Sequence, residues 1–450
     1  MIPGTGVRRM SSHQTNGHAD SEARWEKPSF LRRVRIRNFK SIEFCDVELQ
    51  PLTIILGKNG AGKSNFLGAI EFLRDIFKLG VKGVFEGRFY TWESIYPRNI
   101  GLAESDSVMI EVEVEIQPIQ ADESLRTPTI EQEHIGRFTL WFRRRDEVPV
   151  IERERFTVMS NGRRIAQYQV ADGKLDEENT AFPASFRLPE KAVLDALRHP
   201  DFPLLGLLKA PICNETANSL QAMAFYNFIP ATLRALYAPT HGLLLDKPGR
   251  NIPSVLREMQ RNAPERFDRL LNYLRLIVPE IGEVFSCEVG AYETTRFTMK
   301  DSRLNELASF EAASMSDGTL RALGSLAAVL QQPRPGFEPS LVAIEEPETS
   351  LHPEAVRLLF DALDEATQHT QVLLTAHNAD LLTSRDISPA QVLLAVRRDG
   401  KSVIAPLDAS SREILSQELY SLSELQRMDQ LELDESDLRR QFDSANQDAA

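Results

Sequence analysis

Cysteine and long apolar runs are both scarce in this chain of 450 residues. Its three cysteines, Cys45, Cys213 and Cys287, lie more than 70 residues apart, so there is no CxxC pair or disulfide framework. Apolar runs such as 322–330 are about half of the roughly 20 residues that span a bilayer, and the N-terminus has no apolar signal core. These absences exclude a disulfide-stapled class and a membrane-spanning class, and we expect a cytoplasmic protein.

Positive charge is also in deficit, with 52 Lys and Arg residues against 65 Asp and Glu residues and a net charge of -13. This balance excludes a globally basic nucleic-acid binder but leaves room for a local basic groove. Hydrophobic residues make up 42% and charged residues 26% of the chain, a composition that can bury a core and is not fibrous or disordered. The length predicts two or three domains, or one domain with a large insertion.

A tail and a first α/β block open the chain. Residues 1–28 are rich in Gly, Ser, His, Asn and Pro without apolar periodicity, which predicts a disordered tail. Alternation over 33–37 and at Val47 and Leu49 predicts two half-buried strands, and the apolar run 52–56 predicts a buried parallel strand. After a Gly-rich loop, an apolar stripe predicts a helix from Lys63 to about Lys78.

The middle of the chain is predicted to be an insertion into that block. It begins with an antiparallel region, in which Asn161-Gly162 forms a hairpin turn. Alternation predicts its strands at 108–116, 137–143, 153–159 and 164–170. Further along we expect helices in 189–209 and 215–240, helices beginning near Pro253 and Pro264, and strands in 282–299.

A second α/β block follows from about residue 310. Short apolar strands alternate with helices there, which predicts a parallel sheet covered on both faces. The expected helices are 318–330 and 353–366, and the expected strands are 341–344, 372–375 and 392–396. From Ser411 onward ten Asp and Glu residues face four Arg residues, which predicts a solvated helix followed by disorder.

The segment between the first buried strand and its helix fits G-x-x-x-x-G-K-S/T without deviation. Glycines let such a loop curl until successive N–H groups point into one concavity, and the helix N-terminus adds positive potential. Lys63 would reach the terminal phosphates, and the hydroxyl of Ser64 would ligate Mg²⁺. The expected nucleotide-binding residues are Gly57, Lys58, Asn59, Gly60, Ala61, Gly62, Lys63, Ser64 and Asn65.

Three further motifs follow in the second block. Glu345 and Glu346 end a strand, where one carboxylate would hold Mg²⁺ and the other would orient or deprotonate water; a solvated strand end is the alternative. His377 ends the next strand, a position that favours a catalytic role over a structural one. Ser316 precedes a helix, either as a simple N-cap or as part of a second phosphate-binding helix N-terminus with Asp317 and Gly318.

In this order the motifs resemble the ABC-type ATPase heads of the SMC/RecF/OLD superfamily. Residues 34–41 look like the first strand of that group, and Glu346-Pro347-Glu348 before Leu351-His352-Pro353 is typical of it. The resemblance covers about residues 30–400 and is strongest to stand-alone predicted ATPases related to OLD nucleases. It implies an α/β fold of the P-loop NTPase class, with a mixed or parallel core sheet, an antiparallel β subdomain and an inserted helical subdomain.

The resemblance also implies how the domains are divided. One ATPase fold would be split into a first part at 29–240, which carries the antiparallel insertion, and a second part at 301–408. An inserted helical and β subdomain would occupy 241–300, and an acidic C-terminal helix or tail would occupy 409–450. ATP and Mg²⁺ are the implied cofactors, and ATP would join two copies of the chain head to tail until hydrolysis releases them.

Each motif residue takes an implied role from the same resemblance. Glu345 occupies the Walker B magnesium position beside Ser64, Glu346 is the catalytic glutamate, and His377 is the switch histidine. The signature motif, which closes over the ATP of another subunit, comprises Ser316, Asp317 and Gly318. Ser350, Leu351 and His352 lie where the D-loop falls, and Arg37, Asn38 and Phe39 border the nucleotide base.

Three features depart from the pattern of these heads. Glu345 stands where an Asp is usual, and the signature reads Ser-Asp-Gly rather than the Ser-Gly-Gly of transporters. No glutamine in 81–105 fits the usual Q-loop. The longer side chain of Glu345 would shift the ion or its water shell, and the altered signature favours the RecF/OLD side.

The sequence leaves the biological role open between three alternatives. OLD nucleases append a Toprim domain, but only some 70 residues follow His377 and they lack its acidic pattern, so we expect no intrinsic nuclease activity. One role is the sensor or scaffold ATPase of a bacterial two-component, anti-phage defence type system that controls a separate effector such as a nuclease or toxin. Another is a slowly hydrolysing ATP-binding scaffold. The third is a RecF-like DNA clamp that binds phosphates through a basic face, although acidic residues interleave with its arginines. The arginines of this face are Arg143, Arg144, Arg145, Arg153, Arg155, Arg163 and Arg164.

Overall fold

The computed structural model describes residues 30–447 except 88–89, 97–106, 118–131, 146–147, 182–192, 194–196, 209, 242–243, 302–305, 332–337, 378–386, 418 and 429. The tail predicted at 1–28 and part of the helical region predicted at 189–209 lie outside the described residues. Within the described ranges, no helix combines the length and apolarity that a membrane crossing requires.

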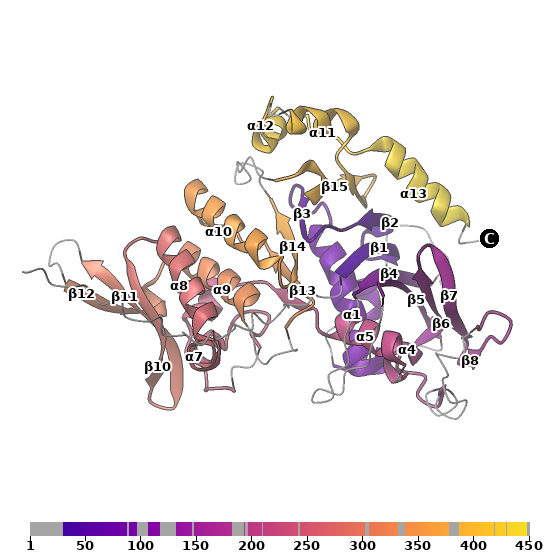
Figure 1. Ribbon diagram of the computed structural model, residues 1–450, viewed down its shortest axis with the longest axis horizontal. Helices are drawn as coiled ribbons and strands as arrows, with labels where there is room; N and C mark the ends of the chain where they lie inside the picture. Colours follow the sequence, from indigo (N-terminus) through magenta and orange to yellow (C-terminus); the bar gives the residue numbers. More distant parts are fainter. Residues whose placement is uncertain are drawn as a thin grey trace, which may run out of the picture.

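A mixed sheet of thirteen described strands runs through the molecule (Figure 1). In spatial order its strands are β8 (Lys174–Leu175), β7 (Arg163–Ala171), β6 (Val148–Ser160), β5 (His134–Arg145), β4 (Val108–Ile116), β1 (Phe30–Phe39), β2 (Ile42–Glu48), β16 (Lys401–Pro406), β15 (Val392–Arg398), β3 (Leu52–Leu56), β14 (Gln371–Ala376), β13 (Leu341–Glu345) and β9 (Ala224–Tyr226). The strands from β15 to β9 are parallel, whereas those from β8 to β2 are antiparallel. This confirms the predicted α/β class with a mixed core sheet and an antiparallel β region.

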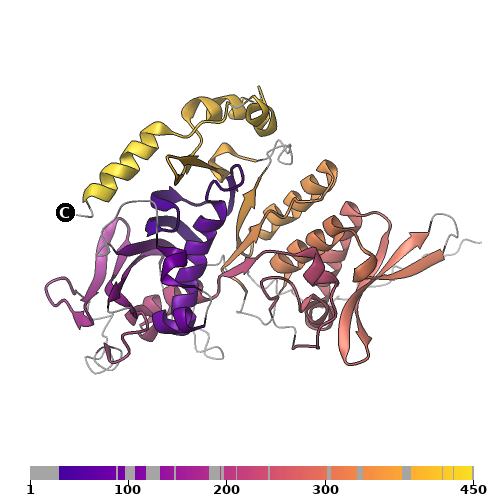
Figure 2. The same ribbon diagram turned by 180° about the vertical axis from the view of Figure 1, so that it is seen from behind.

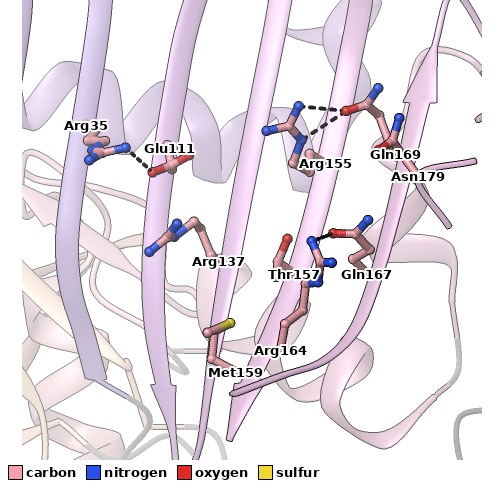
Figure 3. Close-up of a pocket in the computed structure, with 10 residues that line it drawn as sticks. All are labelled: Arg35, Glu111, Arg137, Arg155, Thr157, Met159, Arg164, Gln167, Gln169 and Asn179. Atoms are coloured by element: carbon pink, nitrogen blue, oxygen red, sulfur yellow. Dashed lines mark hydrogen bonds and ion pairs between the residues drawn. The ribbon is translucent and has the colours of Figure 1, made fainter. Parts of the chain in front are cut away.

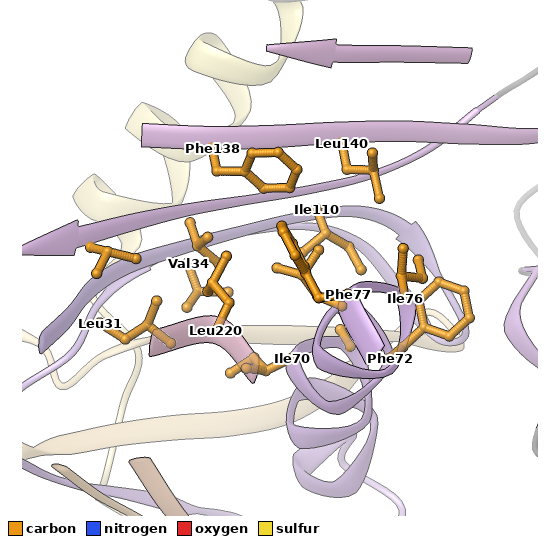
Figure 4. Close-up of a cluster of buried hydrophobic side chains, with 14 of the residues drawn as sticks. Leu31, Val34, Ile70, Phe72, Ile76, Phe77, Ile110, Phe138, Leu140 and Leu220 are labelled. Atoms are coloured by element: carbon orange, nitrogen blue, oxygen red, sulfur yellow. The ribbon is translucent and has the colours of Figure 1, made fainter. Parts of the chain in front are cut away.

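Helix α1 (Lys63–Glu86) lines the inner face of the antiparallel strands (Figure 4). Its Phe72 and Phe77 pack on Phe142 and Phe138 of β5, with ring centroids 5.0 and 5.1 Å apart. Full burial of one such side chain contributes about 1.5–3 kcal/mol. The first core also includes residues from two shorter helices, α4 (Leu204–Leu207) and α5 (Pro211–Gln221).

A second core lies on the other side of the parallel strands. Leu52, Ile54 and Leu56 of β3 face it, whereas Ile55 faces the first core, as expected of a parallel strand buried on both sides. The helices that contribute to it include α7 (Ile252–Asn262), α8 (Pro264–Ile277), α9 (Asp317–Leu330) and α10 (Pro353–Ala366). A separate antiparallel sheet projects beyond them (Figure 2), formed by β10 (Ile281–Val289), β11 (Tyr292–Asp301) and β12 (Glu306–Glu311).

The acidic C-terminal segment forms three helices instead of the predicted solvated helix and disordered tail. They are α11 (Ala409–Ser416), α12 (Leu422–Arg427) and α13 (Glu435–Gln447), which lie along the upper edge of the molecule in Figure 1. Leu422 and Leu438 are buried, and Oε1 of Gln441 accepts a 3.0 Å hydrogen bond from the Asp46 N–H of β2. The prediction was wrong because a few apolar residues in each helix are enough to hold it against the core when each of them is buried there.

Short elements account for most other differences from the sequence prediction. Strands β9, β12 and β16 were not predicted, and β9 interrupts the region 215–240 that was expected to be helical, before α6 (Pro230–Arg234). Helix α1 extends past Lys78 to Glu86, with a non-helical φ of 73° at Gly80. The predicted Asn161-Gly162 turn is confirmed, since both residues have positive φ, 48° and 73°.

Candidate functional site

The loop between β3 and α1 owes its shape to glycines. Gly60 and Gly62 have φ values of 77° and 107°, which L side chains rarely adopt. A Cβ atom at Gly62 would lie 2.1 Å from Oγ of Ser402, and one at Gly57 would lie 2.3 Å from the carbonyl oxygen of Ala395. The tip of the loop is exposed at Lys58, Asn59 and Gly60, and Ala61 behind it is buried. The loop is therefore fitted closely to β15 and β16 behind it, while its tip faces solvent.

The side chain of Lys63, the first residue of α1, folds back onto this loop. Its Nζ donates hydrogen bonds to the carbonyl oxygens of Gly57 at 2.7 Å and Lys58 at 3.4 Å. Nζ also lies 3.7 Å from Oε1 of Glu346, and only 5% of the Lys63 side chain is exposed. A buried ammonium group held by loop carbonyls is well placed to bind a negatively charged oxygen at the loop.

Ser64 and Glu345 meet although they belong to the two halves of the fold. The Ser64 hydroxyl donates a 2.6 Å hydrogen bond to Oε2 of Glu345. They come together because β14 pairs in parallel with both β3 and β13, so the carboxyl ends of these strands share one edge of the sheet. Ligand sites of open parallel sheets form at this edge.

Glu346 follows the end of β13 in a left-handed conformation, with φ of 44°. Its N–H donates to the carbonyl oxygen of Thr375 at 3.1 Å and to Oγ1 of the same residue at 3.2 Å, which fixes the backbone at this turn. The Glu346 side chain is 38% exposed. Its carboxylate is thus held near Lys63 and open to water, as a group that orients a water molecule requires.

Glu348 is a part of the site that the sequence analysis did not identify as functional. Oε1 of Glu348 accepts a 3.0 Å hydrogen bond from the His377 N–H, and the residue is 2% exposed. Burial raises the pKa of Glu348 to about 7, and the hydrogen bond from His377 partly opposes this. Oε2 is buried and has no hydrogen-bond partner among the residues described. The side chain therefore anchors the turn that carries His377, whose own side chain is exposed.

The oxygen atoms at the junction of Ser64 and Glu345 fit magnesium. Mg²⁺ in phosphate-binding proteins takes one or two protein oxygens and completes its octahedron with phosphate oxygens and water. The described residues contain no cluster of three or more His, Cys, Asp or Glu side chains that could hold a metal without such additional ligands. A hydroxyl and a single carboxylate therefore suit an ion that arrives with a nucleotide.

The predicted signature residues lie at the N-terminus of α9. Ser316 caps α9 by accepting a 3.1 Å hydrogen bond from the Thr319 N–H, and its predicted part in a phosphate-binding helix N-terminus stays a prediction. Asp317 pairs with Arg234 at 2.5 Å. A Cβ atom at Gly318 would lie 2.4 Å from the carbonyl oxygen of Ser350, so this helix end packs tightly on the turn after Glu346.

Asn38 and Phe39, which were predicted to border a nucleotide base, have buried side chains, and this role stays a prediction. Phe39 is fully buried, and its ring lies 5.7 Å from that of Phe72 in the first core. Asn38 is 4% exposed and donates to the carbonyl oxygen of Ser107 at 3.1 Å. The positive φ of Asn38, 58°, breaks the strand alternation and turns Phe39 inward. Arg37 is half-buried, and its predicted role stays a prediction.

Several polar residues border the loop without having been predicted. Nδ2 of Asn65 donates to Oγ of Ser41 at 2.6 Å, and Ser41 in turn contacts Oγ of Ser402 at 2.7 Å, which ties the loop to the β1–β2 turn. Nη1 of Arg397 lies 3.4 Å from the carbonyl oxygen of Gly60. The contacts of Ser402 and Arg397 with this region could not be predicted, because they depend on the pairing of β2, β15 and β16 with the parallel strands.

A cavity of about 520 Å³ adjoins the Ser64–Glu345 junction. It is lined by both of these residues and by charged groups that include Lys40, Glu71 and Lys247. Nζ of Lys247 pairs with Oε2 of Glu71 at 2.6 Å, and burial lowers the pKa of Lys40. Charged side chains therefore line the cavity beside Ser64 and Glu345, and no glutamine is among the described residues that line it.

Two sequence families match separate parts of the chain. The family described as "AAA ATPase domain" matches residues 30–126, and the family described as "AAA domain, putative AbiEii toxin, Type IV TA system" matches residues 207–384. The Old nuclease of Escherichia phage P2 is 24% identical over 415 residues, which cover 87% of this chain and 63% of that protein. The OLD nuclease of Thermus scotoductus is 46% identical over 43 residues, 10% of this chain and 8% of that protein.

Solved structures of similar arrangement include two SMC heads. The SmcHead bound to the C-winged helix domain of ScpA has a TM-score of 0.47 at 13% identity, covering 85% of this chain and 99% of that one. The SMC head domain from Thermotoga maritima has a TM-score of 0.40 at 12% identity, covering 84% and 99%. The sequence matches confirm the predicted resemblance to an ATPase of the SMC/OLD type, and the chain spans 63% of the length of its phage relative.

Proposed function

We propose that the chain binds ATP together with Mg²⁺ and hydrolyses it to ADP and phosphate. The observation that carries this proposal is that two pairs of side chains meet at one edge of the sheet. Nζ of Lys63 lies 3.7 Å from Oε1 of Glu346, and Oγ of Ser64 lies 2.6 Å from Oε2 of Glu345. The predicted phosphate loop and acidic strand end are thus joined in space as an ATPase requires. Release of phosphate from ATP by the purified chain, and its loss in Glu346→Gln, tests the proposal.

Each of these residues has a distinct task in the proposed reaction. Lys63 replaces its hydrogen bonds to the carbonyl oxygens of Gly57 and Lys58 by bonds to oxygens of the terminal phosphates. The N–H groups of the loop bind the rest of the phosphate chain. Ser64 and Glu345 hold Mg²⁺, which when bound neutralises charge that develops on the phosphates. Glu346 orients the attacking water and accepts its proton, while His377, anchored by Glu348, contacts the terminal phosphate.

We further propose that two copies of the chain enclose ATP between them. The support is the position of the signature at the N-terminus of α9, where Ser316 and Asp317 are exposed and Gly318 packs on the turn after Glu346. The N-terminus of α9 is a suitable anion site for a second copy. A mass that doubles only with ATP, measured by light scattering, supports this arrangement, and a constant mass in the presence of bound ATP refutes it.

For the biological role we propose a sensor or scaffold ATPase that controls a separate effector such as a nuclease or toxin. The support is the similarity of the chain to OLD nucleases and to a family whose description names a toxin of a toxin–antitoxin system. Purification of the natively tagged protein from its host tests the role. A stable effector in the complex supports it, and a preparation without partners counts against it.

A DNA clamp is the second candidate, favoured by the exposure of Arg153 and Arg163 on the antiparallel sheet. The neighbouring arginines weaken it, because Arg143, Arg144 and Arg145 pair with Glu152, Glu93 and Asp172 respectively, at 2.5–3.6 Å. A gel-shift assay at low salt with ATP decides between a clamp and a slowly hydrolysing scaffold that ignores DNA.

A further inference from the structure

The outer face of the antiparallel sheet, opposite α1, contains a cavity of about 450 Å³ (Figure 3). In sheet order it is separated from the strand that precedes the phosphate loop by β2, β16 and β15. Four arginines line it, one from each of β1, β5, β6 and β7: Arg35, Arg137, Arg155 and Arg164. The other residues that line it are Glu111, Thr157, Met159, Gln167, Gln169 and Asn179. The volume lies within the range of about 300–1,000 Å³ that small-molecule sites occupy.

Two of these arginines are oriented by neutral partners. Nε and Nη2 of Arg155 donate to Oε1 of Gln169 at 2.9 and 2.8 Å, and Nη1 of Arg164 donates to Oε1 of Gln167 at 2.8 Å. An amide oxygen fixes a guanidinium without cancelling its charge. Arg155 also lies 5.6 Å from the ring centroid of Trp141, which restricts its side chain further. Both guanidinium groups are thus ordered and keep their positive charge.

The other two arginines that line this cavity are paired with carboxylates. Arg35 pairs with Asp46 at 2.7 Å and with Glu111 at 3.2 Å, and Arg137 pairs with Glu113 at 2.6 Å. Further along the same face, Arg143 and Arg145 both lie near Asp172. Carboxylates therefore offset the charge of Arg35 and Arg137, whereas Arg155 and Arg164 are bound by amide oxygens.

We propose that the cavity binds a compact, phosphate-bearing small molecule through Arg155 and Arg164, as a second anion site besides the ATP loop. Guanidinium groups match the geometry of phosphate oxygens with paired N–H donors. Thr157 and Asn179 add neutral donors on the wall of the cavity. Such a ligand would be a metabolite or nucleotide that acts as a signal. Strand β1, which contributes Arg35 to the cavity, leads into the turn whose Ser41 is bonded to Asn65 beside the phosphate loop.

Titration calorimetry with inorganic tripolyphosphate tests the site in the full chain carrying Lys63→Ala, which disables the ATP loop. We expect saturable binding, and we expect Arg155→Gln with Arg164→Gln to weaken it at least about tenfold. The matched control replaces Arg143 and Arg145, equally charged and on the same sheet but paired with carboxylates, by glutamine, and should change the affinity less than about twofold. All four positions are near the surface, so thermal melting should confirm that each variant folds.

Two results overturn the proposal. One is tripolyphosphate binding that is absent, or that is equal in the Arg155/Arg164 variant and in its control. The other is a short DNA duplex that binds the same arginines more tightly than tripolyphosphate and displaces it, since the cavity would then belong to a nucleic-acid face. Because the Lys63→Ala background does not require ATP turnover, either result leaves the proposed ATPase function standing.

Discussion

The Ser64 hydroxyl donates a 2.6 Å hydrogen bond to Glu345, a residue 281 positions away in the chain. This bond joins the end of the phosphate loop to the end of the acidic strand across β14. The chain between the two residues, which includes strands β4 to β8 and helices α4 to α9, is accommodated without separating them. The active arrangement thus depends on the parallel half of the sheet, where β3, β14 and β13 are paired in register.

Lys63→Ala should abolish measurable ATP binding. The ammonium group is the buried cation of the loop, and each charge-assisted hydrogen bond to phosphate that is lost contributes roughly 1.5–3 kcal/mol. Calorimetric titration with ATP and Mg²⁺ measures the effect. Lys82→Ala is the control, because Lys82 lies on the same helix, is 58% exposed and pairs only with Glu86 among the described residues. Equal affinity of both variants would contradict the role of Lys63.

Glu345→Gln should raise the Mg²⁺ concentration needed for half-maximal ATP binding by about tenfold or more. The amide keeps the shape of the side chain and can still accept the Ser64 hydrogen bond, but it lacks the charge that attracts the ion. A magnesium titration at fixed ATP measures this shift. Glu354→Gln, an exposed change in the first turn of α10, should leave the titration unchanged. An unshifted curve for Glu345→Gln would place the ion elsewhere.

Glu348 should make folding stability depend on pH between about 4.5 and 7. Its pKa rises from 4.5 to about 7 on folding because the carboxyl group is buried. The folded state therefore binds the proton more tightly, and stability is fully present below the unfolded pKa and is lost as the pH rises through 7. The full effect is on the order of 3 kcal/mol.

Glu348→Gln tests this pH dependence, because the amide oxygen can still accept the His377 N–H bond. Urea unfolding at pH 5 and pH 8 should show the variant gaining stability relative to the parent at the higher pH. Comparing the two proteins removes the contribution of Glu154, whose pKa burial also raises to about 7. A stability difference that does not change with pH would show that Glu348 is not the titrating group.

Gly318→Ala should destabilise the protein by about 1–3 kcal/mol, because its Cβ would meet the carbonyl oxygen of Ser350 at 2.4 Å. Gly68→Ala is the matched control, a helical glycine whose Cβ would meet only the flexible end of Lys40, at 3.3 Å. Alanine favours a helix by roughly 0.5–1 kcal/mol over glycine, so this control should be neutral or stabilising. Similar unfolding midpoints for both variants would refute the close contact between α9 and the turn after Glu346.

The sequence predicted those parts of the site that are encoded locally. A phosphate loop needs glycines and a lysine at fixed spacing, so its position could be read directly from residues 57–64. The role of Glu348 could not be predicted from its place in a sequence motif. Its burial and its bond to His377 arise from the turn that Glu346 begins. The burial of Phe39 could not be predicted, because the left-handed Asn38 reverses the face of β1 that Phe39 occupies, and a strand pattern alone does not reveal this reversal.

Edge elements were the least predictable part of the fold. Strand β9 has three residues and becomes a strand only by pairing with β13, so its sequence carries no pattern long enough to recognise. The acidic C-terminal segment was expected to be a solvated helix followed by disorder, yet Leu425 of α12 and Leu438 of α13 are buried. Burial of a few side chains against distant segments decides such cases, and it cannot be inferred from local periodicity.

The most direct test of the account is Glu346→Gln in the full chain, assayed for ATP binding, phosphate release and mass in solution. The account predicts that the variant binds ATP like the parent, releases phosphate at least about 10²-fold more slowly, and accumulates as an ATP-dependent dimer. Phosphate release at the rate of the parent protein would contradict it, because Glu346 would then not be the residue that activates water.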